Sequence, residues 1–161
     1  GGRGILRSWD GNPNDLQAAD FFELAIPSCD AMIHWDHHSY LPDLVVISLA
    51  TNDFNLGVPP QTQFETAYTS LIQRVLMVHP QAHVAITEGS MLNNNAIGEG
   101  HKSIAKDYLN NVIMAINNKR VCYMPSNYYP GDDSDPHPTR EQHSKIADDF
   151  VMHIRRIMSW S

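Results

Sequence analysis

A histidine that could serve as a general base lies between two prolines, in the stretch DPHP at residues 135–138. The imidazole of His137 could take a proton from a nucleophile and later return it to a leaving group. Asp135 could accept a hydrogen bond from the other ring nitrogen and so select the tautomer. A competing interpretation is a loop histidine beside a helix N-terminus that has no chemical role. Asp132 and Asp133 are near enough to replace Asp135 as the orienting partner.

Two further groups could stabilise an oxyanion. Asn52 follows a run of apolar residues, and its side-chain N–H could donate to a developing negative charge, a contribution of about 3–4 kcal/mol to barrier lowering. Asn52 and Asp53 could equally form an ordinary turn. In the stretch GGRG, Gly2 or Gly4 could bring a backbone N–H close to an oxyanion where a Cβ would obstruct it, or these glycines could simply belong to a flexible terminus.

The stretch HWDHH at residues 34–38 has the composition of a metal site but not its spacing. His37 and His38 are adjacent and point apart in regular structure, and no Cys or Glu stands at ligand spacing. We therefore expect a solvated loop there rather than a metal site. Cys29 and Cys122 could form one disulfide or remain two unpaired buried thiols.

Three segments have the apolar repeat of amphipathic helices, at about 62–78, 102–118 and 140–158. Capping residues support the first and the last of these, since Thr62 precedes Glu65 by three residues and Thr139 precedes Gln142 likewise.

Each helix follows a short, continuous apolar run, at 44–49, 84–87 and 121–124. Such runs are typical of strands covered on both faces, and strand–helix alternation predicts a parallel sheet in a three-layer α/β/α sandwich. Ligands bind beyond the carboxyl ends of such strands, where polar residues collect in this sequence. We expect one domain over residues 1–161.

The composition is that of an ordinary globular protein, with 42% apolar and 18% charged residues among 161. The net charge of −7 argues against nucleic acid and against an anionic membrane surface as partners. No apolar stretch approaches the 18 residues that a membrane span requires.

Four stretches, taken together and in this order, resemble one family. They are GGRGILRSWDG at 1–11, PDLVVISLATNDF at 42–54, GSMLN at 89–93 and DPHPTREQHSKIADDF at 135–150. They are similar to conserved blocks of the SGNH (GDSL-type) hydrolases, and more closely to carbohydrate esterase family 2, which removes acetyl groups from plant polysaccharides. The resemblance favours an extracellular protein.

The resemblance implies roles for individual residues. Gly2 and Asn52 become oxyanion donors, His137 the general base and Asp135 its orienting partner. From the same stretches we expect the substrate to contact Trp9, Asp53, Phe54 and Met91. Three positions depart from the family pattern: Ala50 stands in place of Gly, Ser90 in place of Pro, and Pro136 where an aromatic residue is common.

The family's nucleophilic serine belongs to a Gly-Asp-Ser block, and no such tripeptide occurs in the 161 residues. We therefore expect the chain to be the C-terminal portion of a domain whose first strand–helix unit is missing. Ser90 is a conceivable substitute, but EGSML does not match the G-x-S-x-G elbow.

Two functions remain open. The first is a carbohydrate acetylesterase that acts by serine acylation once the missing segment is present, a route that needs no metal or organic cofactor. The second is an inactive binding module, or a structural subunit of a larger assembly that covers the exposed sheet edge.

Overall fold

The computed structural model describes residues 2–26, 33–94 and 100–160, and it confirms the expected α/β fold. Three strands, β1 (Leu44–Ser48), β2 (His83–Thr87) and β3 (Val121–Tyr123), form a parallel sheet in the order β1-β2-β3. Because the strands are parallel and in register, their carboxyl ends meet at one edge of the sheet.

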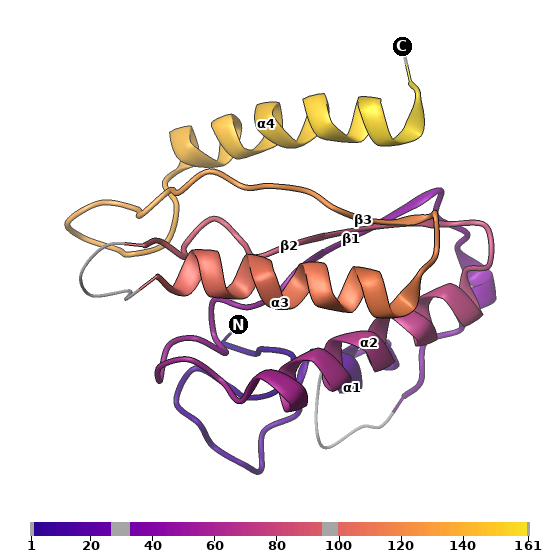
Figure 1. Cartoon of the computed structure of the whole chain (residues 1–161), viewed down its shortest axis with the longest axis horizontal. Coiled ribbons are helices and arrows are strands. Elements are labelled where there is room, and N and C mark those ends of the chain that lie inside the picture. The colour runs from indigo at the N-terminus through magenta and orange to yellow at the C-terminus, as the bar shows by residue number, and fades with distance from the viewer. Residues whose placement is uncertain (1, 27–32, 95–99, 161) are drawn as a thin grey trace.

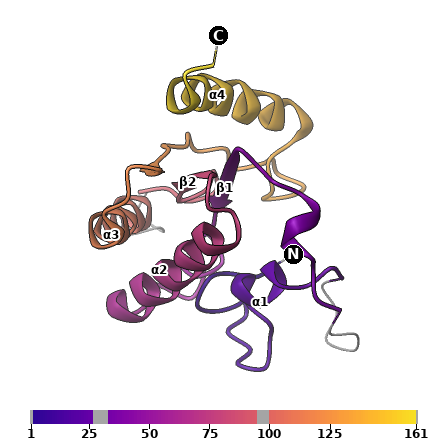
Figure 2. The ribbon, with the colours of Figure 1, turned by 90° about the vertical axis from the view of Figure 1, so that its right-hand side faces the viewer.

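Three long helices lie on the two faces of this sheet, as Figures 1 and 2 show. Helices α2 (Gln61–Val78) and α3 (His101–Ile116) lie together on one face, and α4 (Arg140–Met158) lies on the other. These bounds are within two residues of those expected from the apolar repeats. In the described residues, no helix combines the length and the apolar character needed to cross a bilayer.

Two short elements come before the sheet and were not predicted. Helix α1 (Ala18–Phe22) spans five residues, and the 3₁₀ turn η1 (His37–Ser39) spans three. Neither is long enough to show a helical repeat, so the apolar pattern could not reveal them.

The face under α2 and α3 is a closed core. Phe64, Tyr68 and Ile72 of α2 have no exposed surface, and neither do Val84 and Ile86 of β2. Phe64 and Tyr68 also stack near each other, with ring centroids 5.4 Å apart. This face supplies most of the apolar burial in the described chain.

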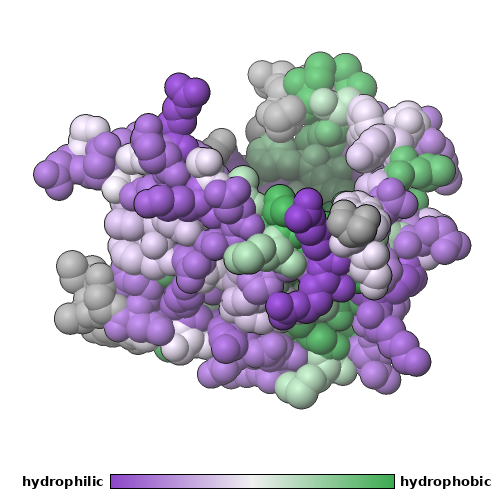
Figure 3. All heavy atoms as spheres, turned by 90° about the horizontal axis from the view of Figure 1, so that it is seen from above, coloured by the Kyte–Doolittle hydropathy of each residue, from purple (hydrophilic) through white to green (hydrophobic). Residues whose placement is uncertain are grey.

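The opposite face is open. None of the 19 residues of α4 is buried, although its apolar side chains repeat every three or four positions. These side chains, each only partly covered, are Ile146, Phe150, Ile154 and Ile157. Figure 3, which looks on to this side, shows hydrophobic atoms recessed among hydrophilic ones.

Candidate active site

A hollow of about 620 Å³ lies where the strand-end loops meet. It brings together Gly2, Asn52 and His137, which are far apart in the sequence, and adds Trp9 and Met91. Among the described residues, the lining consists of Gly2, Trp9, Thr51, Asn52, Asn55, Met91, Pro136 and His137. Five of the eight residues expected at the site therefore face one cavity.

Asp135 orients His137 directly. Its Oδ1 lies 2.6 Å from Nδ1 of the imidazole and also accepts the backbone N–H of His137 at 2.9 Å. These two hydrogen bonds, the backbone one first, lower the pKa of the Asp135 carboxyl. An ionised Asp135 favours the tautomer with the proton on Nδ1, which leaves Nε2 free to accept a proton.

The loop that carries the pair is closed by the N-cap of α4. Gln142 accepts from the backbone N–H of Thr139 and of Gly131 and donates to the Gly131 carbonyl, while Thr139 Oγ1 accepts from Gln142 N. Gly131 has φ +80°, and a Cβ there would lie 2.2 Å from the Asp135 carbonyl oxygen. The capping box expected from the sequence thus also fixes the position of His137.

Asn52, one of the two expected oxyanion donors, is hydrogen-bonded to the loop that carries the other, Gly2. Asn52 Nδ2 donates one hydrogen to the carbonyl of Arg3 at 2.9 Å, which leaves its second hydrogen for the cavity. Gly2 has φ +76°, and a Cβ there would lie 2.6 Å from Cδ1 of Trp9. Only glycine fits this position without displacing the indole ring.

Asp53 was expected to contact substrate, but the structure places it in the interior with no exposed surface. Its carboxylate accepts the backbone N–H groups of Ile5, Leu6 and Arg7 at 2.8–3.1 Å. Burial raises the pKa of Asp53, and these three hydrogen bonds oppose that shift. Asp53 therefore anchors the loop that presents Gly2.

Phe54 was also expected at the substrate and is instead part of the core, 1% exposed. Its ring lies 6.0 Å from that of Phe64 and 5.4 Å from that of His101. Neither Asp53 nor Phe54 lines the cavity, because the turn after β1 directs both side chains inward.

Three lining residues were not predicted as site residues: Thr51, Asn55 and Pro136. Asn55 Nδ2 donates to the carbonyl of Trp9 at 2.8 Å and so ties the two walls together. The only signal in the sequence that Asn55 belongs to the site was its position in the same turn as Asn52.

Other candidates of the sequence lie elsewhere. The stretch at 34–38 lies at the far end of the molecule, and the expectation of a solvated loop is wrong for His37. This residue is buried, stacks on Phe22 with ring centroids 4.5 Å apart and also contacts the ring of His79, while the other residues of the stretch are exposed. Among the described residues, no three His, Cys, Asp or Glu side chains come together to hold a metal ion. Cys122 is a free thiol, and Cys29 lies outside the described residues.

Comparison with known proteins gives the following relatives. The chain is 36% identical over 160 residues to an acetylxylan esterase / glucomannan deacetylase of Cellvibrio japonicus, covering 99% of this chain and 43% of the relative. A family two carbohydrate esterase structure from the same organism superposes with a TM-score of 0.94 at 36% identity, covering 99% of this chain and 46% of that one.

A second structure is that of a family two carbohydrate esterase from Clostridium thermocellum in complex with cellohexaose. It has a TM-score of 0.81 and 27% identity, and the match covers 99% of this chain and 49% of that chain. No family model matches the sequence. The chain thus spans about half the length of the esterase structures it matches. The likeness expected from the motifs is confirmed: this chain has the α/β fold of the SGNH hydrolases and resembles the family 2 carbohydrate esterases over nearly its whole length.

Proposed function

We propose that this chain supplies the oxyanion donors and the general base of an esterase that removes acetyl groups from carbohydrates. The observation that carries the proposal is the convergence of Gly2, Asn52 and His137 on one cavity, with Asp135 hydrogen-bonded to the histidine. No other described cluster pairs an oriented imidazole with two candidate oxyanion donors.

The chemistry follows from these positions. As a serine oxygen attacks the acetyl carbon, His137 Nε2 takes the hydroxyl proton. The negative charge that forms on the acetyl oxygen is stabilised by the Gly2 N–H and by Asn52 Nδ2. The protonated imidazole then gives its proton to the departing sugar oxygen, which leaves an acetyl-serine. In the second half of the reaction His137 takes a proton from water as the water attacks the acetyl carbon, and then returns it to the serine oxygen as acetate leaves.

The attacking serine is proposed to come from a segment outside the 161 residues. Of the eight described residues that line the cavity, only Thr51 carries a hydroxyl, and Ser90 is not among them. The esterase structures are about twice as long as this chain, so they contain ample sequence for such a segment.

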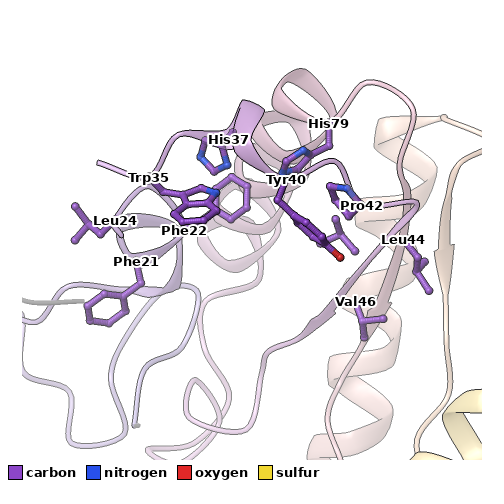
Figure 4. A pocket seen from close by; sticks show the side chains of 11 residues that line it. Phe21, Phe22, Leu24, Trp35, His37, Tyr40, Pro42, Leu44, Val46 and His79 are labelled. Carbon is purple, nitrogen blue, oxygen red and sulfur yellow. The ribbon is translucent and has the colours of Figure 1, made fainter. Parts of the chain in front are cut away.

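A groove along the outer edge of β1 supports the placement of that segment. In the described residues β1 pairs only with β2, so its other edge is unpaired. Two adjoining hollows of about 510 and 350 Å³ run along this edge and share Phe21, Phe22, Val45 and Val46. Figure 4 shows the larger one, with Trp35 and Tyr40 beside it. A strand paired with β1 would satisfy its backbone, and a following helix would cover the apolar side of α4.

A carbohydrate substrate fits both the cavity and the relatives. Trp9 is 57% exposed at the cavity rim, so its ring is available to a sugar. The Cellvibrio relative is named for acetylxylan and glucomannan, and the Clostridium structure holds cellohexaose. We therefore propose an acetylated plant polysaccharide or its oligosaccharides as the substrate.

The alternative is a binding module or structural subunit with the same fold. It is favoured because no serine is among the described residues that line the cavity, and a sugar could bind there without being hydrolysed.

The test is acetate release from acetylated xylan by the full-length protein that contains this chain. We expect turnover that His137→Ala abolishes and that Asn52→Ala lowers by about 10²–10³-fold. The matched control is His143→Ala, because His143 is exposed on α4 and does not line the cavity.

The 161 residues alone should show only the residual acceleration of about 10³–10⁴ over water that oxyanion and binding groups provide. Binding of oligosaccharide without any acetate release by the full-length protein would favour the binding module. Enzymic rates from the 161 residues alone would contradict the proposed location of the serine, and Thr51→Val and Ser90→Ala would then identify the nucleophile.

A further inference from the structure

The segment 126–129, which follows β3, connects the sheet to α4 through a series of hydrogen bonds. We propose that this segment, with Asp149 of α4, is a polar bracket that holds His137 at its working distance from the oxyanion donors. Asp149 is the positioning residue at its outer end. The proposal rests on the proposed function, because it assigns a role relative to His137.

The inner end of the bracket is buried beside the sheet. Ser126 is 6% exposed, and its Oγ donates to the carbonyl of Gly89 at 2.8 Å. Its own carbonyl accepts from Lys102 Nζ at 2.5 Å, and that ammonium lies 3.6 Å from the fully buried carboxylate of Glu88. These contacts fix Ser126 relative to β2 and α3.

The middle of the bracket is hydrogen-bonded to the loop that leads into the cavity. The backbone N–H of Tyr129 donates to the carbonyl of Ser90 at 2.7 Å. Ser90 directly precedes Met91, which lines the cavity, so the bracket and this cavity wall are fixed together.

The outer end of the bracket is hydrogen-bonded to α4. Oδ2 of Asp149 accepts from Tyr129 Oη at 2.7 Å and from Asn127 Nδ2 at 2.8 Å. These bonds lower the pKa of the Asp149 carboxyl, with the tyrosine bond first, so Asp149 is a charged acceptor at neutral pH. Hydrogen bonds to a charged partner are the strong class.

Apolar packing alone holds α4 loosely, because none of its residues is buried and its apolar side chains are only partly covered. His137 lies two residues before Thr139, the N-cap of α4, and Gln142 of the helix also bonds Gly131 at the start of the same loop. A shift of the helix should therefore move the imidazole with it. A displacement of about 1 Å can cost roughly 10²-fold in rate. The bracket therefore controls the geometry of the base without touching substrate.

The experiment compares Asp149→Ala with Asp148→Ala in the full-length protein. Asp148 is the preceding residue of the same helix, is exposed and makes no hydrogen bond with the described residues. We expect Asp149→Ala to lower kcat at least tenfold with KM within twofold, and Asp148→Ala to leave both within twofold. Asp149→Asn, which keeps one acceptor, should recover part of the loss. Tyr129→Phe should lower kcat by a smaller factor and add nothing to Asp149→Ala.

Hydrogen exchange of the 131–139 amides provides a readout that does not depend on activity. Asp149→Ala should speed exchange there, and Asp148→Ala should not. If the wild-type protein lacks esterase activity but this exchange difference is present, the proposed function fails and the bracket stands. Equal exchange and equal kcat in the two variants would overturn the bracket. If Asp149→Ala does not fold, the same comparison made with Tyr129→Phe, which removes one hydroxyl only, decides the matter.

Discussion

The two faces of the sheet differ sharply in how they are covered. Under α2 and α3, large side chains such as Phe64 and Tyr68 have no exposed surface. Under α4 no helix residue is buried, and Val46 of the edge strand is 38% exposed. The same amphipathic pattern thus produces a closed core on one side and an open one on the other.

This difference separates helix formation from helix packing. The α4 helix has the expected capping box and an apolar repeat. The cap expected for α2 from Thr62 and Glu65 is wrong, because α2 begins after Pro60 without a side-chain cap, so the local signals of α4 are the better ones. Within the described residues, its apolar side is only partly covered. The closed face is thus packed by the described residues, whereas the open face would be completed by the covering segment proposed above.

The strongest test of the comparison removes a large side chain from the closed face. Phe64→Ala should lower the unfolding free energy of the 161-residue chain by about 3–5 kcal/mol, because it leaves a cavity in a fully packed core. Urea denaturation followed by circular dichroism measures the change. A loss below 1 kcal/mol would mean that this face is not the stabilising core.

The matched change on the open face is Phe150→Ala. In the 161-residue chain it should cost less than about 1 kcal/mol, since the ring is only partly covered. In the full-length protein the cost should rise to roughly 3 kcal/mol if a further segment covers α4. An equal, small cost in both would contradict the proposed covering segment.

The stability of the folded chain should fall in acid because of His79, the C-cap residue of α2. Burial, with smaller contributions from His37 and His38, lowers its pKa, so the folded chain binds this proton less readily than the unfolded chain does. The stability that neutral His79 contributes is present above the unfolded pKa of about 6.5 and is lost as the pH falls through the lower folded value. The charged groups nearby are Glu23 and Arg74, which pair with each other and remain ionised throughout, since Arg74 lowers the pKa of Glu23 to about 2.

Unfolding measured between pH 7.5 and 5 should therefore show falling stability, and His79→Phe should flatten that dependence. His143→Gln is the control, because His143 is exposed on α4. An unchanged pH dependence in His79→Phe would assign the effect to another group.

The smallest expected effect concerns the turn into the cavity. Ala50 has φ +153°, a region that costs a non-glycine residue of order 1–3 kcal/mol. Ala50→Gly should relieve this strain but lose a buried methyl group, for a net gain of about 1 kcal/mol or less. Ala85→Gly, in the middle of β2, should instead destabilise, and equal losses at both sites by thermal denaturation would show that Ala50 is not strained.

Much of the fold could be predicted from local pattern. Continuous apolar runs identified β1, β2 and β3, and four-residue repeats identified α2, α3 and α4, because each of these elements is long enough or apolar enough to repeat. Helix α1 escaped, since five residues with the sequence AADFF carry no periodic signal.

The sequence by itself determined the candidate chemistry: Asn52, His137 and Asp135 were identified from residue types and motif order, and the cavity contains the first two with the third bonded to His137. Only the tertiary structure decided the direction of their neighbours. Asn52, Asp53, Phe54 and Asn55 follow one another, yet Asn52 and Asn55 line the cavity while Asp53 and Phe54 are buried. The reason is long-range. Three backbone N–H groups from residues 5–7 donate to the carboxylate of Asp53, and the rings of Phe64 and His101 pack against Phe54. Partners distant in the sequence therefore set which side chains of the turn face the cavity.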